Sequence, residues 1–340
     1  MMRADYRNIL VIEFGQLGDV VLSLPALHAL RTRYPSARIT ALVGKPGRSI
    51  IELAGFIDDC IPVDRVALRD GPRGWALRQL VALATDVRRR RFDLVIDLQS
   101  LQETNLLGWA SGAPARLFGR RPRRSLDFLS NVRPRPPIDT ENRHITDRLL
   151  DVVRVLGCDG PNTYPLQPRV ADRVPFDAAL ARAGYQPGTP LVGFFCGAGD
   201  PRRRWPMERF AALAHRLDRE CGVRVAVFTG PEEEAVHDPV ALGFPATTIL
   251  ADMLPMPQFA AAAQRVTVLV SNDTGPMHVT AAVGTPVVAL LGRVDWEIYV
   301  PIGAQHRTVR GVGMANVPVD AVFEATRASL AEAAARGVRA

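Results

Sequence analysis

The chain has 340 residues and a formal net charge of +7, and 47% of its residues are hydrophobic. These values are typical of a soluble globular protein with two domains of ordinary size. No apolar run approaches the roughly 18 residues that a membrane-spanning helix needs, and acidic residues interrupt the apolar N-terminal stretch, which argues against a signal peptide. The four cysteines are scattered without metal-ligand spacing, so we expect reduced cysteines, a cytoplasmic location and no metal site.

Strand-like and helix-like segments alternate along the chain, which indicates α/β layers with parallel sheets. In the first half the pattern predicts a strand at 8–14, a helix at 19–33 that breaks near Pro25, strands at 38–43 and 61–63, an amphipathic helix at 74–90, a strand at 94–97 and a helix at 149–156. The intervening stretch 113–139 is rich in Pro and Arg and has no clear periodicity. It is predicted to be an extended or mobile loop.

A second series of elements begins near residue 191, after a stretch with Pro and Gly at 185–190. It comprises strands at 191–195, 224–229, 266–270 and 286–291, and helices at 208–220, 258–263, 277–283 and near 319–336. The chain is therefore predicted to form two similar α/β units joined by a linker near 165–190. Ligands commonly bind between two such domains.

The most informative turn is the segment NDTGPMH at 272–278, which follows the apolar run VTVLV. The run is short and β-branched, as expected for a parallel strand that is covered on both faces. Pro276 suits the first turn of a helix, where its missing N–H costs nothing. The free N–H groups of such a helix start bind anions, above all phosphate, and His278 lies in the same turn. We therefore expect a phosphorylated ligand at the end of this strand.

Two further turns carry candidate chemistry. After the first strand, Gly15 and Gly18 match a dinucleotide fingerprint only loosely, which disfavours a dehydrogenase. Asp19 follows, and it either caps the next helix and complements its dipole or acts as a general base at an interdomain cleft. In the second half, the small residues 197–199 let a phosphate approach the backbone, and the arginines at 202–204 supply countercharge.

The charged segments leave more than one interpretation open. Glutamates at 232–234 either hold ribose hydroxyls or favour the helix dipole. Arginine runs at 88–91 and within 116–135 fit either a solvated basic face or bidentate contacts with phosphate or carboxylate. An anionic membrane surface or a phosphorylated lipid fits them as well. Nucleic acid is disfavoured because the runs lack interleaved aromatic residues and known motifs.

Taken together and in this order, the motifs resemble glycosyltransferase family 9, the heptosyltransferases of lipopolysaccharide core assembly. The resemblance covers nearly the whole chain. Its motifs are GDV at 18–20 with LPAL at 24–27, GA at 197–198 with RWP at 204–206, and DTGPMH at 273–278 with AA at 281–282 and GTP at 284–286. It implies a GT-B fold, that is, two Rossmann-like doubly wound parallel-sheet domains that face a central cleft.

The resemblance also implies a domain assignment and a reaction. It places an acceptor-binding domain at 1–170, a donor-binding domain at 171–322 and a C-terminal helix at 323–340 that packs back on the first domain. The implied reaction is an inverting, metal-independent transfer of heptose from ADP-heptose, without a cofactor, to a hydroxyl of a lipopolysaccharide core acceptor. The implied partners are the nucleotide sugar, an anionic lipid-linked sugar acceptor and, peripherally, the cytoplasmic face of the inner membrane.

The candidate site residues follow from the matched motifs and the basic segment. Asp19 matches the family's proposed catalytic base, and Glu233, with Glu232 as the alternative, matches its ribose-binding glutamate. The remaining donor-binding positions are Gly197, Ala198, Gly199, Arg203, Leu254, Asp273, Thr274, Gly275 and His278, and the acceptor-binding positions are Gly18, Arg120, Arg121, Arg123 and Arg124.

Two departures from the family pattern leave the donor open. The family commonly has Lys at the position of Arg203, and these side chains are not interchangeable. It commonly has Ser or Thr at the position of Gly199, so a hydroxyl contact to phosphate is missing. A GT-B enzyme that uses another nucleotide sugar, as a transferase or an epimerase, is therefore the alternative. A non-catalytic nucleotide-binding relative is disfavoured because a binding module needs no base.

Overall fold

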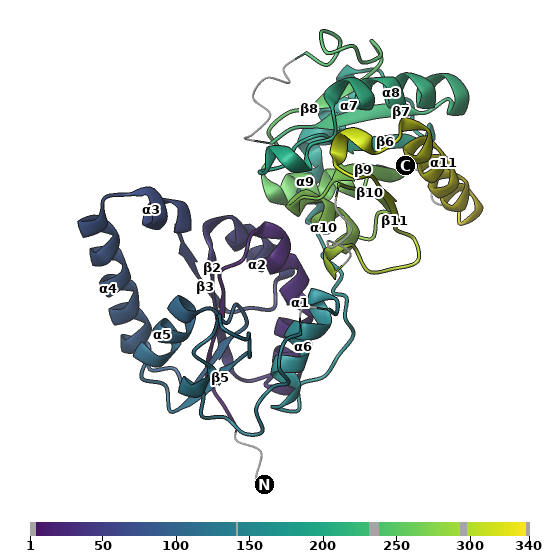
Figure 1. The fold of residues 1–340 in the computed structure, drawn as a ribbon. Helices are drawn as coiled ribbons and strands as arrows, with labels where there is room; N and C mark the ends of the chain where they lie inside the picture. Colours follow the sequence, from purple (N-terminus) through teal and green to yellow (C-terminus); the bar gives the residue numbers. More distant parts are fainter. Residues whose placement is uncertain (1–4, 141, 231–237, 293–297, 338–340) are drawn as a thin grey trace. The chain divides into compact units, whose positions relative to one another are not determined.

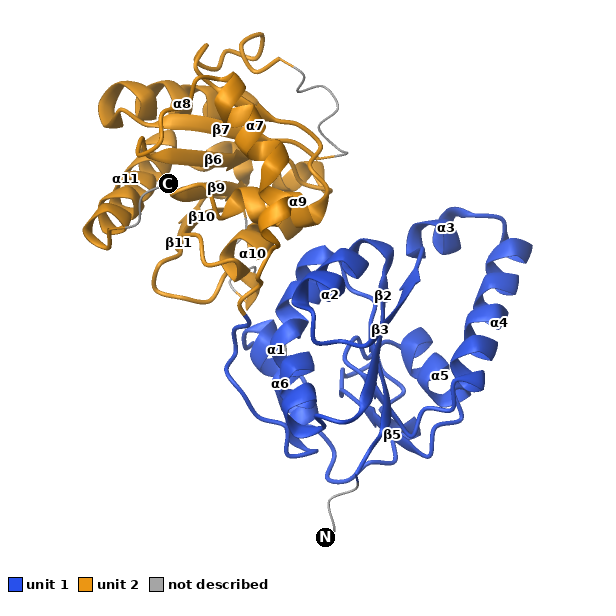
Figure 2. Cartoon of the chain, turned by 180° about the vertical axis from the view of Figure 1, so that it is seen from behind, with its two compact units in different colours: residues 1–164 blue, residues 165–340 orange. Residues whose placement is uncertain are grey.

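The computed structural model describes residues 5–140, 142–230, 238–292 and 298–337. The chain divides into two compact units, residues 1–164 and 165–340 (Figures 1 and 2). Each unit is a parallel β-sheet with helices packed on it, so the predicted α/β fold is confirmed. The boundary between the units lies between residues 164 and 165. The domain assignment in the sequence analysis put it between residues 170 and 171. No helix in the described part of the chain combines the length and the apolar character that crossing a membrane requires.

The sheet of unit 1 is built around β1 at its centre. Its strands are parallel and lie in the order β3-β2-β1-β4-β5. They are β1 (Asn8–Glu13), β2 (Arg38–Gly44), β3 (Asp59–Val63), β4 (Leu94–Asp97) and β5 (Ala115–Phe118). All residues of β1 after its first are buried, as expected for a central strand whose two faces are both covered.

Helices cover both faces of this sheet. One face carries α1 (Leu17–Arg33), α2 (Arg48–Ala54) and α6 (Ile145–Arg154), and the other carries α3 (Arg65–Asp70), α4 (Arg73–Arg89) and α5 (Gln102–Ala110) (Figures 1 and 2). On the second face, Leu10 and Ile12 of the central strand pack with Val87 of α4 and Phe118 of β5. The central strand therefore contributes to the core that lies under α4.

Helix α1 runs without interruption through Pro25, so the predicted break in this helix is wrong. A proline inside a helix removes one hydrogen bond and strains the preceding turn. Here all of residues 20–27 are buried, and the packing on both sides of Pro25 holds the helix together. Ser23 also donates its hydroxyl to the carbonyl of Val20 at 2.8 Å, within the turn before the proline.

The stretch 113–139, which was predicted to be a loop, contains strand β5. The prediction is wrong at 115–118, where β5 pairs with β4 and buries Leu117 and Phe118, and hydrogen bonds hold the residues around it. The Arg116 side chain donates to the carbonyls of Leu129 at 3.1 Å and Ala113 at 2.7 Å. The Arg116 backbone N–H donates to Asn131 Oδ1 at 2.8 Å. Contacts of this kind between side chains and backbone leave no periodicity in the sequence.

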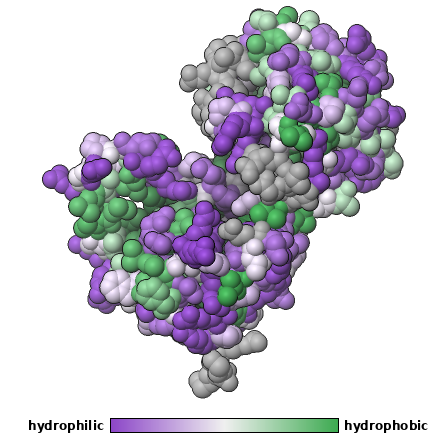
Figure 3. Space-filling model, viewed as in Figure 1, coloured by the Kyte–Doolittle hydropathy of each residue, from purple (hydrophilic) through white to green (hydrophobic). Residues whose placement is uncertain are grey.

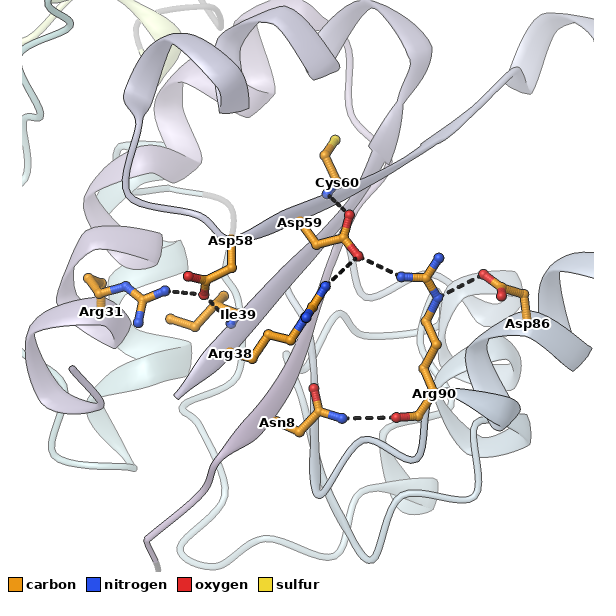
Figure 4. A network of polar contacts seen from close by, with 9 residues as sticks. All are labelled: Asn8, Arg31, Arg38, Ile39, Asp58, Asp59, Cys60, Asp86 and Arg90. Atoms are coloured by element: carbon orange, nitrogen blue, oxygen red, sulfur yellow. Dashed lines mark hydrogen bonds and ion pairs between the residues drawn. The ribbon is translucent and has the colours of Figure 1, made fainter. Parts of the chain in front are cut away.

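Ion pairs fasten a helix to the amino edge of the unit 1 sheet (Figure 4). Asp59, the first residue of β3, accepts from Arg90 Nη1 at 2.7 Å and lies 3.5 Å from Arg38 Nη2 of β2. Arg90 follows α4 and also donates to Asp86 of that helix at 2.9 Å. Arg90, a member of the arginine run at 88–91, therefore ties α4 to the sheet.

Within the described residues, the sheet of unit 2 has six parallel strands in the order β11-β10-β9-β6-β7-β8. They are β6 (Leu191–Phe195), β7 (Arg224–Phe228), β8 (Ile249–Ala251), β9 (Val268–Asn272), β10 (Val287–Leu291) and β11 (Arg307–Arg310). Its helices are α7 (Val174–Arg182), α8 (Met207–Cys221), α9 (Met256–Ala263), α10 (Gly275–Ala282) and α11 (Val319–Ala335). The sequence analysis did not predict the two edge strands, β8 and β11, which have three and four residues.

The last helix, α11, packs inside unit 2. Val322 and Phe323 belong to the core of this unit. Arg216 of α8 lies 3.8 Å over the Phe323 ring and donates to Asp320 at 2.5 Å. The resemblance places a C-terminal helix from residue 323 onwards against the first domain. In the structure, the buried face of this helix is taken up by the core of unit 2.

Candidate functional site

Three carboxyl groups gather at the carboxyl edge of the unit 1 sheet. Glu13 ends β1, Asp97 ends β4, and Asp19 lies in the first turn of α1. The two strands are neighbours, with Ile12 opposite Asp97, so their ends lie side by side. Glu13 and Asp97 are buried, whereas Asp19 is half-buried. Open parallel sheets bind their ligands at this edge, so the carboxyl groups lie where a substrate is expected.

Asp19 caps helix α1. Its Oδ2 accepts from the backbone N–H of Gln16, the N-cap residue, at 2.6 Å. Gly18, which the sequence placed in the acceptor site, is buried beside it in the same turn. The hydrogen bond orients the Asp19 carboxylate, but a carboxylate has two oxygens and several acceptor positions. The capping role predicted from the sequence is therefore present, and it leaves a role as general base open.

Gly15 brings the carboxyl groups of Glu13 and Asp19 close together. A Cβ atom at Gly15 would lie 2.2 Å from Asp19 Cβ, 2.7 Å from Asp19 Oδ2 and 2.7 Å from Glu13 Oε1. The two carboxyl oxygens flank one point, so they are no farther apart than twice 2.7 Å. Only a glycine fits in this turn, because a larger residue would displace Asp19.

This proximity and burial keep a proton on Glu13. Burial, and after it the negative charge of Asp19, raise the pKa of Glu13 from its ordinary value of 4.5 to about 8. The hydrogen bond that Glu13 Oε1 accepts from Gly15 N–H at 2.9 Å and the charge of Arg121 act in the opposite direction. At neutral pH the Glu13 carboxyl is therefore mainly uncharged, and two adjacent negative charges are avoided.

Asp97 holds the loop that follows β4. It accepts from the backbone N–H of Ser100 at 2.7 Å and from Asn105 Nδ2 at 2.6 Å. Asn105 in turn accepts from the backbone N–H of Leu126 at 2.7 Å. Burial raises the pKa of Asp97 to about 6, against the hydrogen bonds that lower it. Asp97 therefore connects the end of β4 to the segment that contains the basic residues 120–124.

A cavity of about 50 Å³ begins at the residues that follow Asp97, and it is lined by residues after β4 and β5 and by α6. The charge of Arg121 acts on both Glu13 and Asp97, which ties the cavity to them. Of the residues that the sequence analysis assigned to acceptor binding, Arg120 and Arg121 line this cavity, whereas Arg123 and Arg124 are exposed and are not among its lining residues.

Two arginines that the sequence analysis did not single out, Arg143 and Arg148, also line the cavity, together with Asp139 and Asp151. Arg148 of α6 is only 8% exposed, and its Nη2 donates to Asp139 Oδ2 at 2.5 Å. Its Nε and Nη1 have no hydrogen-bond partner among the described residues. Buried N–H groups without an acceptor are costly. The side chain is therefore suited to an oxyanion that enters the cavity. The sequence signal that could have identified Arg148 is a charged residue on the buried side of an amphipathic helix.

In unit 2 the structure brings the two predicted phosphate turns together. One follows β6 and the other follows β9, and these strands are neighbours with Phe195 opposite Ser271. Arg203 Nη1 of the first turn lies 3.3 Å from Asp273 Oδ2 of the second. Helix α10 starts at Gly275 with Thr274 as its N-cap residue, and His278 is buried in its first turn. The predicted arrangement of strand, turn and helix start is confirmed.

A buried amide that the sequence analysis did not assign fastens the two turns to each other. Asn272, the last residue of β9, is completely buried. Its Oδ1 accepts from the backbone N–H of Trp205 at 3.0 Å, and its Nδ2 donates to the carbonyl of Cys196 at 2.6 Å. Both partners flank the first turn. The position of that turn therefore depends on a side chain from the neighbouring strand.

The remaining predicted donor positions surround these turns or lie outside the described residues. Gly197 and Ala198 are buried, and Gly199 is exposed. Leu254 is half-buried in the turn between β8 and α9, at the same edge of the sheet. Glu233 and its alternative Glu232 lie outside the described residues. In the described part of the chain, no group of three or more His, Cys, Asp or Glu could hold a metal ion.

Comparison with known proteins decides the family. The model of "Glycosyltransferase family 9 (heptosyltransferase)" matches residues 80–319. The chain belongs to this family. The family 9 chain is 24% identical to lipopolysaccharide heptosyltransferase 2 of Escherichia coli K12, over 89% of this chain and 88% of that protein.

Solved structures agree with this assignment. The glycosyl transferase family 9 protein from Veillonella parvula has a TM-score of 0.82 at 26% identity, over 97% of this chain and 99% of that chain. The E. coli heptosyltransferase WaaC with ADP-2-deoxy-2-fluoro heptose has a TM-score of 0.74 at 22% identity, over 94% and 99%. The family 9 chain therefore has the GT-B fold and is a glycosyltransferase.

The raised pKa of Glu13 predicts a pH-dependent stability for this family 9 enzyme. In the folded state the pKa is about 8, above the ordinary value of 4.5, so stability falls as the pH rises from about 5 to about 8. Glu13→Gln keeps the neutral shape and removes this loss. In urea denaturation, the variant should gain on the wild type by on the order of 1 kcal/mol per pH unit in this interval. If the free energy of unfolding changes with pH in the same way in both proteins, the pKa of Glu13 is not raised in the folded state.

The buried amide of Asn272 predicts a clear loss of stability on its removal. Asn272→Ala removes the acceptor of the buried Trp205 N–H and the bond to the Cys196 carbonyl, which costs about 1–3 kcal/mol. Asn316→Ala is the matched control, because the Asn316 amide donates to the Val312 carbonyl at 2.6 Å on the exposed surface. The control should change stability by less than about 0.5 kcal/mol. Equal losses in chemical denaturation would contradict the role of Asn272.

Proposed function

We propose that this glycosyltransferase moves a heptose from ADP-heptose to a hydroxyl of a lipopolysaccharide core acceptor, with inversion at the anomeric carbon and without a metal or cofactor. The observation that carries the proposal is that two family motifs each lie at the carboxyl edge of a parallel sheet. Asp19 follows β1, and the DTGPMH turn at 273–278 follows β9. The names of the relatives support the donor and the acceptor class. We further propose that the enzyme works in the cytoplasm, peripherally on the inner membrane.

The donor would bind in unit 2. The N–H groups at the start of α10 would hold the diphosphate, with Arg203 and His278 beside them. Such preorganised donors stabilise the charge of a leaving group as it develops. The ribose would contact Glu233, and Leu254 would line the adenine pocket. A different nucleotide sugar is the second candidate, because Gly199 offers no hydroxyl and Arg203 stands where the family commonly has Lys.

The acceptor would bind in unit 1, with its reacting hydroxyl at Asp19. The hydroxyl oxygen attacks the anomeric carbon and forms the new C–O bond, and its proton passes to the Asp19 carboxylate. The bond from that carbon to the diphosphate oxygen breaks at the same time, and ADP leaves with the electron pair. The neutral Glu13 beside Asp19 leaves the base as the charged member of the pair. An anionic group of the acceptor would enter the arginine-lined cavity.

The base assignment is tested with Asp19→Asn. The asparagine oxygen can still accept from Gln16 N–H, so helix α1 keeps its cap. The rate of heptose transfer should fall ~10²–10⁴-fold, because an amide cannot take the proton, and ADP affinity should not change. Asp177→Asn is the control, since Asp177 lies in the first turn of α7 and pairs with Arg265 at 3.1 Å. A near-normal transfer rate in Asp19→Asn would rule out this residue as the base. The anomeric configuration of the product, measured by NMR, tests inversion.

The arginine-lined cavity is tested with Arg148→Met, which keeps the length of the side chain and removes its charge. The KM for the acceptor should rise about tenfold or more, the effect of losing a charged hydrogen bond, while the KM for the donor stays the same. Asp139 keeps Arg121 as a partner at 3.6 Å, so the buried carboxylate is not left alone. Arg182→Met, on the exposed end of α7, is the control. An unchanged acceptor KM in Arg148→Met would remove the cavity from the acceptor site.

A further inference from the structure

Helix α3 and the first half of α4 contain no fully buried residue. No residue of α3 is buried, and the buried residue of α4 is Val87, near its C-terminal end. Residues 73–82 are exposed except for the half-buried Ala76. A surface helix of a globular protein ordinarily buries an apolar stripe along its length. Most side chains of this part of unit 1 therefore lie outside its core.

Helix α4 carries one broad apolar stripe, and only its C-terminal part is covered. Leu83 and Val87 pack into the core of unit 1. Leu77, Leu80 and Val81, at the spacing i, i+3 and i+4, widen and continue this stripe toward the start of the helix, since Leu80 lies seven residues before Val87. These three side chains are 63%, 49% and 58% exposed. An ordered apolar stripe in water is unfavourable and indicates a surface that is covered in use.

Neighbouring helices extend this surface, which we call the outer face. Val66 of α3 is 62% exposed and Trp75 of α4 is 42% exposed. On α5, which contacts α4, Leu106 and Trp109 are 50% and 55% exposed. Figure 3 shows hydrophobic residues gathered over α4 and α5. Single exposed apolar residues are ordinary, but a cluster of this extent marks an interaction site.

The charges around the outer face are mainly positive. Arg73 lies four residues before Leu77, and Arg88 lies seven residues after Val81, so both flank the apolar stripe on the same face of α4. Arg78 between them is exposed as well. A helix face with Leu and Trp flanked by arginines is typical of helices that lie in the interface of an anionic membrane. A symmetric contact between two copies would instead bring these positive charges together.

We propose that the outer face docks on an anionic lipid bilayer, with Leu77, Leu80 and Val81 among the lipid headgroups and the arginines on the lipid phosphates. The inference deepens the proposed function, since a lipid-linked acceptor lies at such a surface. The docking itself requires neither donor nor acceptor, so it can be measured separately from transfer.

Sedimentation with vesicles tests the docking. Wild-type protein should bind vesicles of phosphatidylcholine with phosphatidylglycerol and should bind pure phosphatidylcholine vesicles much more weakly. The double variant Leu77→Gln with Val81→Gln should lose about tenfold or more in affinity for the anionic vesicles. The matched control is Val170→Gln with Val174→Gln, since these two valines are 77% and 65% exposed in unit 2. All substituted residues are exposed, and thermal unfolding verifies that each variant is folded.

A charge-reversal variant separates the electrostatic part. Arg73→Glu with Arg78→Glu should lose the preference for anionic vesicles, and the binding of the wild type should weaken as salt is added. Vesicle affinity that is the same in the wild type and in the Leu77→Gln, Val81→Gln variant would overturn the proposal.

Self-association is the competing outcome. Self-association would be seen in sedimentation velocity as a wild-type dimer and a monomeric Leu77→Gln, Val81→Gln variant. Together with no vesicle binding, this result would overturn the membrane proposal and assign the outer face to a second copy.

Heptose transfer to an acceptor dissolved in detergent distinguishes failure of the docking proposal from failure of the proposed function. Normal transfer by a protein that does not bind vesicles removes the docking and leaves the proposed function. Vesicle binding without any heptose transfer would support the docking and overturn the proposed function.

Discussion

Buried polar side chains at the carboxyl edges of the two sheets hold the turns on which the site depends. A turn that follows a buried strand carries backbone groups that need hydrogen-bond partners. In unit 2 the partner is the amide of Asn272, which joins the turn after β6 to the end of β9. In unit 1 the partner is the carboxylate of Asp97, which holds the loop after β4. With these turns held in place, the candidate donor and acceptor groups acquire defined positions.

The same arginine-rich composition serves different purposes in different places. Arg90 closes ion pairs at the amino edge of the unit 1 sheet, where it is structural. Arg148 is buried with open N–H groups in a cavity at the opposite edge. Arg73 flanks an exposed apolar stripe. Net charge alone cannot separate these roles, because burial and the position of the carboxylates decide what each guanidinium does.

The sequence was sufficient for the features that rest on local patterns. The β-branched run before residue 272 and the proline and glycine of the following turn predicted a strand, a turn and a helix start, and β9 and α10 have this arrangement. Features that depend on long-range contacts were not accessible. The pairing of Glu13 with Asp19 needs the close approach at Gly15, and the role of Asn272 needs the neighbouring strand. The continuity of α1 through Pro25 likewise depends on packing.

In the proposed function, the two turns of unit 2 bind an adenine nucleotide sugar. Calorimetric titration of the purified protein with ADP, UDP and GDP in parallel is the test of this donor site. We expect selective binding of ADP, which is weakened when His278 is replaced by alanine. Stronger binding of UDP or GDP would contradict the assignment of the donor, although the GT-B fold and the family would stand.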